Sequence, residues 1–163
     1  METEAVQITV FDLAAEDCAQ TAEKLRAYCM GRGLPVKVEQ FTKIQPFVLD
    51  FKSRCDAGRC YDMAFVGADS IMGVEAARHI RGMDDLFPLF FVSHRGNDYG
   101  MEAYRLLALH YLIKPVSAQA LETCISRITC NQYSGRRPTL LRGGQAEWWD
   151  NAYPSPYKRR KAE

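Results

Sequence analysis

The chain has 163 residues, of which 47% are apolar and 25% are charged, and its formal net charge is +1 at pH 7. These values are typical of one soluble globular domain with a short extension, and they exclude a protein that attracts polyanions through its total charge. The acidic N-terminal segment lacks the apolar core of a signal peptide, and no segment reaches the ~18 apolar residues of a membrane span, so we expect a cytoplasmic protein without membrane contact.

The N-terminal third of the chain is predicted to form two strands and two helices in alternation. Residues 6–12 are apolar and β-branched, as in a strand, and residues 35–41 alternate with a period of two, as in a half-exposed edge strand. Residues 14–33 carry apolar side chains at helical spacing and end in glycines. Residues 43–58 predict a second helix, with Pro46 in its first turn, where the missing N–H costs little.

The next 70 residues continue the alternation. Residues 61–67 and 87–93 are continuous apolar runs, which are typical of strands buried on both faces. A short strand at 110–115 ends at Pro115. Helices are predicted at 71–83, at 97–109 (weakened by Gly100) and at 117–128 (with Ser117 as its N-cap).

Five strands and five helices in strict alternation predict a doubly wound α/β fold with parallel strands joined by right-handed crossovers. In such folds the functional residues lie at the carboxyl ends of the strands. The residues that end the first, third, fourth and fifth predicted strands are Asp12, Gly67, Ser93 and Lys114. The third strand therefore delivers a residue with no side chain to the place where a functional group is expected.

The C-terminal segment, residues 131–163, breaks the alternation. It carries seven basic and three acidic residues, a net charge of +4, so residues 1–130 carry −3. We expect it to be mostly irregular and anchored by the aromatic cluster at 147–153. A basic run at its end could contact nucleic-acid phosphates, although a solvated terminal charge run is the favoured interpretation: Lys158, Arg159, Arg160 and Lys161.

Six cysteines occur without a C-x-x-C pair or a Cys/His metal-binding pattern. We expect reduced and partly buried thiols, as is usual in a cytosolic protein. The alternative is a bridge between Cys55 and Cys60 in "RCDAGRC".

The segment "NDYGMEAYRLLALHYLIKPVSAQALETCI" (97–125) resembles the receiver domains of bacterial two-component response regulators, and in particular those attached to LytTR-type DNA-binding domains. The segments "YDMAFV" and "GVEAARHIR" are similar to the third strand and third helix of receivers. The resemblance covers residues 1–130, which we take as one receiver-like domain. It implies a flavodoxin-like (βα)₅ fold with the strand order 2-1-3-4-5.

Receivers accept a phosphoryl group on an Asp at the end of the third strand, beside a Mg²⁺ held by two acids after the first strand. A Ser or Thr after the fourth strand and a Lys–Pro pair in the fifth strand complete their site. On this chain the resemblance places Asp12 at the first acid, Leu13 at the second, Gly67 at the acceptor, Ser93 at the hydroxyl and Lys114 at the lysine. It also implies a cis Lys114–Pro115 bond and places Tyr111 at the aromatic switch position.

Because Gly67 has no nucleophile and Leu13 cannot ligate a cation, the phosphoacceptor pocket is degenerate. We expect Mg²⁺ binding to be weak or lost, no cofactor and no catalytic residue, and therefore a protein that is not an enzyme. Lys114 loses its usual partner, so we expect a salt bridge between Asp12 and Lys114 across the pocket. Asp69, two residues beyond Gly67, is a candidate displaced acceptor, although a solvated or capping role is favoured.

The sequence thus predicts a pseudo-receiver that acts through protein contacts without phosphorylation, in transcriptional regulation. Its partner would be a regulator or a kinase, and it would dimerise through the fourth helix, fifth strand and fifth helix, the face that the family uses. The first alternative is a DNA-associated transcription regulator that uses the basic tail, although the last 33 residues are too few for a LytTR-type domain. The second is a phosphoacceptor receiver that uses Asp69.

Overall fold

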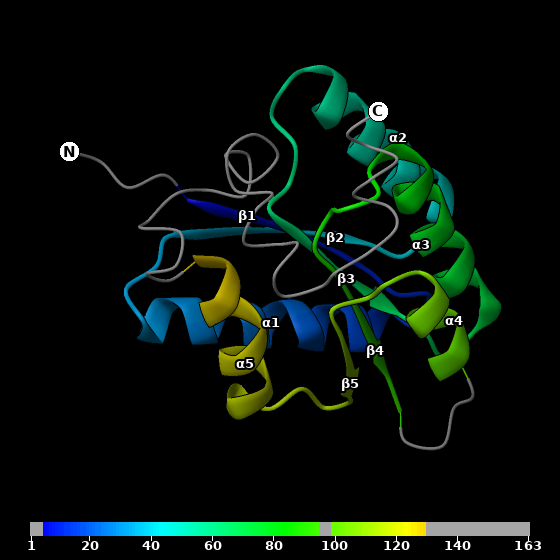
Figure 1. The fold of residues 1–163 in the computed structure, drawn as a ribbon. Coiled ribbons are helices and arrows are strands. Elements are labelled where there is room, and N and C mark those ends of the chain that lie inside the picture. The colour runs from blue at the N-terminus through cyan, green and yellow to red at the C-terminus, as the bar shows by residue number, and fades with distance from the viewer. Residues whose placement is uncertain (1–4, 95–98, 130–163) are drawn as a thin grey trace.

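The computed structural model describes residues 5–94 and 99–129, which form one sheet with helices on both faces (Figure 1). The elements in chain order are β1 (Val6–Phe11), α1 (Ala15–Gly31), β2 (Val36–Phe41), α2 (Ile44–Asp56), β3 (Met63–Gly67), α3 (Ile71–Met83), β4 (Leu89–Ser93), α4 (Gly100–Arg105), β5 (His110–Ile113) and α5 (Ala118–Thr129). The predicted alternation is therefore confirmed within these residues.

The five strands are parallel and lie in the order β2-β1-β3-β4-β5, as predicted. The apolar runs of β3 and β4 form the centre, where every residue is buried. The polar–apolar alternation of β2 places it at the edge, where its residues alternate between partly buried and exposed positions. Burial thus follows the sequence pattern strand by strand.

Successive side chains of each strand point to opposite faces, and this alternation divides the core into two clusters. On β3, Met63 and Phe65 pack with α1 and α5, while Ala64 and Val66 pack with α2 and α3. Figure 1 shows α1 and α5 on one face of the sheet and α2, α3 and α4 on the other.

The fourth helix is shorter than predicted. We expected helix over residues 97–109, but α4 covers only Gly100–Arg105. It ends because Leu107 takes a positive φ of 58°, which a continuing right-handed helix does not allow. Two local predictions beyond it are confirmed: the Ser117 hydroxyl accepts a hydrogen bond from the Ala120 N–H (3.1 Å) at the start of α5, and the Lys114–Pro115 bond is cis.

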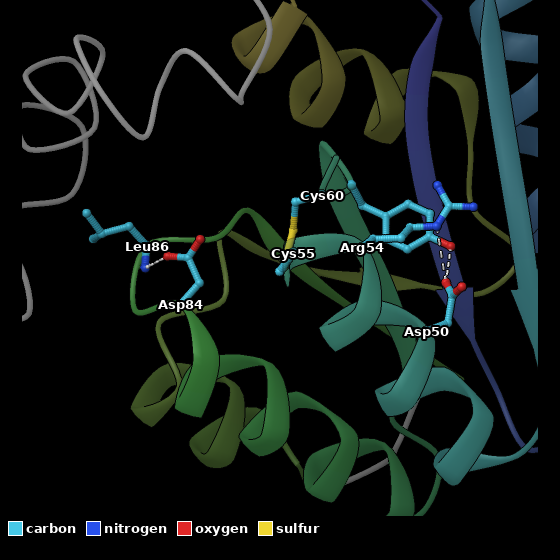
Figure 2. The surroundings of a disulfide bond; sticks show 7 residues. Asp50, Arg54, Cys55, Cys60, Asp84 and Leu86 are labelled. Atoms are coloured by element: carbon cyan, nitrogen blue, oxygen red, sulfur yellow. Dashed lines mark hydrogen bonds and ion pairs between the residues drawn. A yellow bond between two sulfur atoms is a disulfide. The ribbon is translucent and has the colours of Figure 1, made fainter. Parts of the chain in front are cut away.

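The expectation that all cysteines are reduced is wrong for one pair. Cys55 in the last turn of α2 and Cys60 before β3 form a disulfide (Figure 2). The chain reverses between them through Gly58, whose φ of +77° suits a residue without Cβ, and the two Cα atoms come within 4.4 Å. Cys18, Cys29 and Cys124 are buried and lie outside this disulfide.

No helix among the described residues is long and apolar enough to cross a membrane.

Candidate functional site

Parallel strands bring the predicted site residues to one edge of the sheet. Asp12 follows β1, Gly67 ends β3, Ser93 ends β4 and Lys114 follows β5. Backbone hydrogen bonds align these ends, since the Lys114 N–H donates to the Ser93 carbonyl at 2.8 Å. The structure therefore brings the four residues together at the carboxyl edge, at the position of the predicted pocket.

The Lys114 ammonium lies at the centre of this pocket. Its side chain is only 3% exposed, and Nζ donates to Asp12 Oδ2 at 2.6 Å, which confirms the predicted salt bridge. Two further carboxylates contact the same nitrogen: Asp69 Oδ2 at 2.6 Å and Asp17 Oδ2 at 3.0 Å. Three carboxylates thus share one ammonium, so this group carries a net charge of −2 when all are ionised.

The space over Gly67 is occupied by the Asp12 side chain. A Cβ built on residue 67 would collide with the carboxylate of Asp12. The other oxygen of this carboxylate, Oδ1, accepts a hydrogen bond from the Ala14 N–H at the start of α1 (3.1 Å). Asp12 is therefore fixed by Lys114 on one side and by the backbone on the other, across the position where the resemblance places an acceptor.

Asp69 is not a solvated or capping residue, and that favoured interpretation is wrong. Besides its contact with Lys114, its Oδ1 accepts a hydrogen bond from the His94 backbone N–H at 2.8 Å. The β3–α3 connection spans only residues 68–70, and its helix cap is Ser70, whose hydroxyl accepts from the Met72 N–H. The short connection holds Asp69 over the pocket because both of its oxygens are engaged there.

Sequence reasoning missed Asp17 and His94. Asp17 lies in the first turn of α1, and His94 follows β4; His94 Nε2 lies 3.0 Å from Asp17 Oδ2. An acid in a first helical turn is ordinarily interpreted as a partner of the helix dipole. The available signal was positional: the turn after β1 and the residues after β3 and β4 must all lie at the carboxyl edge.

The electrostatics of the pocket follow from these contacts. Burial alone would lower the pKa of Lys114, but the hydrogen bonds to Asp12, Asp69 and Asp17 outweigh it and raise that pKa above its ordinary value. The hydrogen bond from Lys114 lowers the pKa of Asp17, against a smaller opposing effect of burial. Lys114 and Asp17 therefore stabilise one another's charged forms.

The remaining predicted residues lie around this charged group. Ser93 Oγ is 2.8 Å from the Tyr111 hydroxyl oxygen, and the Tyr111 ring is half-buried against Phe91 at a centroid distance of 6.0 Å. Leu13 is exposed beside Asp12. The tail residues Lys158, Arg159, Arg160 and Lys161 lie outside the described residues.

The residues at positions 12, 13 and 67 do not fit a receiver-type Mg²⁺ site. Leu13 offers no oxygen, Gly67 has no side chain, and both oxygens of Asp12 already accept hydrogen bonds from the protein. One oxygen or nitrogen atom from each of Asp17, Asp69 and His94 lies within 4.8 Å of the others. Lys114 already holds both carboxylates of that set, so a cation there would compete with the ammonium.

Comparison with known proteins identifies the fold. Three similar solved structures are a CheY-like response regulator receiver domain protein from Methanospirillum hungatei (12% identity, 76% of this chain and 93% of that one, TM-score 0.58), a receiver domain protein from Clostridium thermocellum (20%, 75% and 92%, 0.60), and DrrB, an OmpR/PhoB homologue of Thermotoga maritima (18%, 77% and 52%, 0.55). No protein-family model and no curated protein sequence matches the chain. The chain thus has the fold of receiver domains.

Proposed function

We propose that this protein is a response-regulator-type signalling module whose state is set by protein binding and not by phosphorylation of a strand-end aspartate. The observation that carries the proposal is the Asp12 carboxylate, which lies across Gly67 and is bound to Lys114 at 2.6 Å. Phosphoryl transfer needs a nucleophile and positioned positive charge. At residue 67 the nucleophile is missing, and the lysine charge is already matched by carboxylates.

Exposed apolar residues on α4 and β5 support an interaction role. Tyr104 is 76% exposed, and Met101 and Ile113 are also exposed large apolar side chains. A contiguous patch of exposed apolar side chains is typical of a protein interface. We propose that this surface, together with α5, binds a regulator, a kinase or a second copy of the chain.

Intact-mass measurement tests the independence from phosphorylation. The full chain is incubated with a small phosphodonor and Mg²⁺, beside a receiver that is known to accept phosphoryl groups from the same donor. We expect the control to gain one phosphoryl group and this chain to gain none. A stable adduct on this chain would overturn the proposal.

A second candidate function is phosphoryl acceptance on Asp69. The favouring observation is that Asp69 makes the 2.6 Å contact with Lys114 and accepts from the His94 N–H, so its carboxylate lies among groups that could hold phosphoryl oxygens. The same mass experiment distinguishes the candidates. An adduct that Asp69→Asn abolishes and Asp56→Asn retains would establish Asp69 as the acceptor.

Self-association through α4 and β5 is tested by light scattering after size exclusion. If the exposed apolar surface is a dimer face, Tyr104→Ser weakens the dimer about tenfold or more, because a buried aromatic anchor contributes over 1 kcal/mol. Met30→Ser is the matched control, since Met30 is 75% exposed at the end of α1. A monomer at every concentration would leave only a different protein as the partner.

Nucleic-acid contact by the basic tail stays a separate prediction. It requires DNA binding that weakens steeply with salt and is lost when residues 154–163 are deleted. Binding that survives this deletion would contradict it.

A further inference from the structure

The cysteines of the described residues fall into two chemically different groups. Cys18, Cys29 and Cys124 are buried, and burial raises the pKa of the Cys29 thiol to about 11 and also raises that of Cys18. Such thiols are protonated and shielded, so they react slowly. Cys55 and Cys60 lie next to one another at the opposite edge of the sheet from Lys114, and Cys55 is partly exposed.

The chain reversal that joins the two cysteines is also held by contacts other than the disulfide. The N–H groups of the turn donate back into the last turn of α2: Ala57 to Ser53 (3.0 Å), Gly58 to Cys55 (3.1 Å) and Arg59 to Arg54 (2.8 Å). The disulfide joins residues only five positions apart, for which the chain-entropy gain is smaller than for a long loop. Because the hydrogen bonds of the turn do not involve sulfur, we expect the two sulfurs to stay near one another after reduction.

Side-chain contacts also hold α2 against the segment that leads into β3 (Figure 2). The Tyr61 hydroxyl hydrogen bonds to Asp50, the Arg54 guanidinium lies 4.3 Å from the centre of the Tyr61 ring, and Arg54 pairs with Asp50 at 3.4 Å. These contacts link α2 to the start of β3 without involving sulfur. We therefore expect the fold to persist when the disulfide is reduced.

Cys60 lines a groove of about 750 Å³ that also contains the exposed cations Lys37 and Arg59. A third cation of this groove, Arg54, is already paired with Glu39 (3.7 Å) and Asp50 (3.4 Å). Nearby cations favour the thiolate over the thiol, and the thiolate is the form that attacks a disulfide. They also attract a small thiol that carries carboxylates.

We propose that Cys55 and Cys60 form a reversible thiol–disulfide site that exchanges with small anionic thiols of the glutathione class. A thiolate of the small molecule attacks one sulfur, the S–S bond breaks, and the other cysteine leaves as a thiolate that takes a proton from water. A second small thiol attacks the mixed disulfide and releases the first cysteine. Two small thiols are oxidised to one disulfide, and the cysteine pair gains two electrons and two protons.

The experiment uses the full chain carrying Cys130→Ser, equilibrated with mixtures of reduced and oxidised glutathione, quenched with acid and alkylated after denaturation. Intact mass counts the free thiols, and peptide mapping locates them. We expect the fraction of Cys55 and Cys60 present as free thiol to fall about tenfold or more in the oxidising mixtures and to recover in the reducing ones. Cys18, Cys29 and Cys124 stay free throughout.

Two further measurements keep the test decisive. Circular dichroism is expected to be unchanged on reduction, while amide exchange rises only over residues 54–60. Cys55→Ser and Cys60→Ser are each expected to gain one glutathione in the oxidising mixture, because a single thiol can form only the mixed disulfide. The proposal is overturned if Cys55 and Cys60 stay free under oxidation, or if reduction unfolds the chain.

Discussion

Arg81 and Lys114 are buried basic residues, and they lie at opposite edges of the sheet. Lys114 contacts three carboxylates at the carboxyl edge. Arg81, in the last turn of α3, donates hydrogen bonds to backbone carbonyls at the amino edge. Its guanidinium donates to the carbonyls of Leu106 (2.6 Å), Leu107 (3.1 Å), Asp84 (3.1 Å) and Phe87 (2.7 Å).

The two cations are held by different partners: Arg81 by hydrogen bonds to backbone carbonyls, and Lys114 by ion pairs with carboxylates. The planar fork of Arg81 matches fixed carbonyls of the α3–β4 and α4–β5 connections, so it positions backbone. Lys114 is a compact charge that neutralises part of an acidic cluster, two of whose members, Asp17 and Asp69, are partly exposed. The amino edge is therefore held by hydrogen bonds to backbone carbonyls, and the carboxyl edge by ion pairs, whose strength we expect to depend on pH.

The largest expected effect on stability comes from removing the hydrogen bonds that Arg81 donates. Arg81→Met keeps the apolar stem but removes the donor of two buried and two partly buried carbonyls, and it should lower the free energy of unfolding by about 3–5 kcal/mol. Arg78→Met is the control, because Arg78 makes an exposed pair with Glu75 and its loss should cost under about 0.5 kcal/mol. Urea denaturation measures both. Equal losses of stability in Arg81→Met and Arg78→Met would show that the hydrogen bonds of Arg81 do not stabilise the amino edge.

A smaller effect is expected at the carboxyl edge. Lys114→Met leaves the buried Asp12 carboxylate without a cation. Because Asp12 keeps the hydrogen bond from the Ala14 N–H, the variant should lose about 2–3 kcal/mol at pH 7. An unpaired buried carboxylate binds a proton more readily folded than unfolded, so the variant should regain stability as the pH falls from 7 to 5. Lys52→Met, which removes an exposed pair with Asp56, should change little. A loss at Lys114 that does not depend on pH would contradict the expected pH dependence of the carboxyl edge.

The contrast also explains which features the sequence could predict. Strands, sheet order and core follow from local apolar patterns, such as the continuous run of β3 and the alternation of β2. The Asp12–Lys114 pair was predictable because both residues end strands that must meet at one edge. Asp17 and His94 were missed because they lie outside the strands, in segments where polar side chains are common. Their contact with one another follows only from the packing of α1 against the end of β4.

Arg81 was missed for a related reason. In "GVEAARHIRGM" an arginine agrees with the polar side of an amphipathic helix, and nothing in the segment indicates that four carbonyls of later loops surround it. The α4 helix was predicted too long because Leu107, an ordinary helix former, takes a positive φ there. The carbonyls of Leu106 and Leu107 both accept from Arg81, so a tertiary contact overrides the local preference.

The smallest expected effect tests the pH dependence of the carboxyl edge most directly. Lys114 holds the pKa of Asp17 below its ordinary value of 3.8, so the folded state favours the ionised carboxylate. The stabilisation from Asp17 is therefore present above that value and is lost as the pH falls through the lowered folded-state pKa. Since Asp17 is partly exposed, Asp17→Asn should cost under about 1 kcal/mol at pH 7, and the stabilities of the two proteins should begin to converge as the pH falls below 3.8.

Urea denaturation of both proteins between pH 7 and pH 3 measures this convergence. Glu23→Gln is the matched control on the same helix, because Glu23 is exposed and its substitution should change stability by no more than about 0.5 kcal/mol at any pH. A constant difference between wild type and Asp17→Asn would mean that Asp17 contributes by packing or by a neutral hydrogen bond. The ion pair with Lys114 would then depend on Asp12 and Asp69, and Asp17 would contribute nothing to the pH dependence of the carboxyl edge.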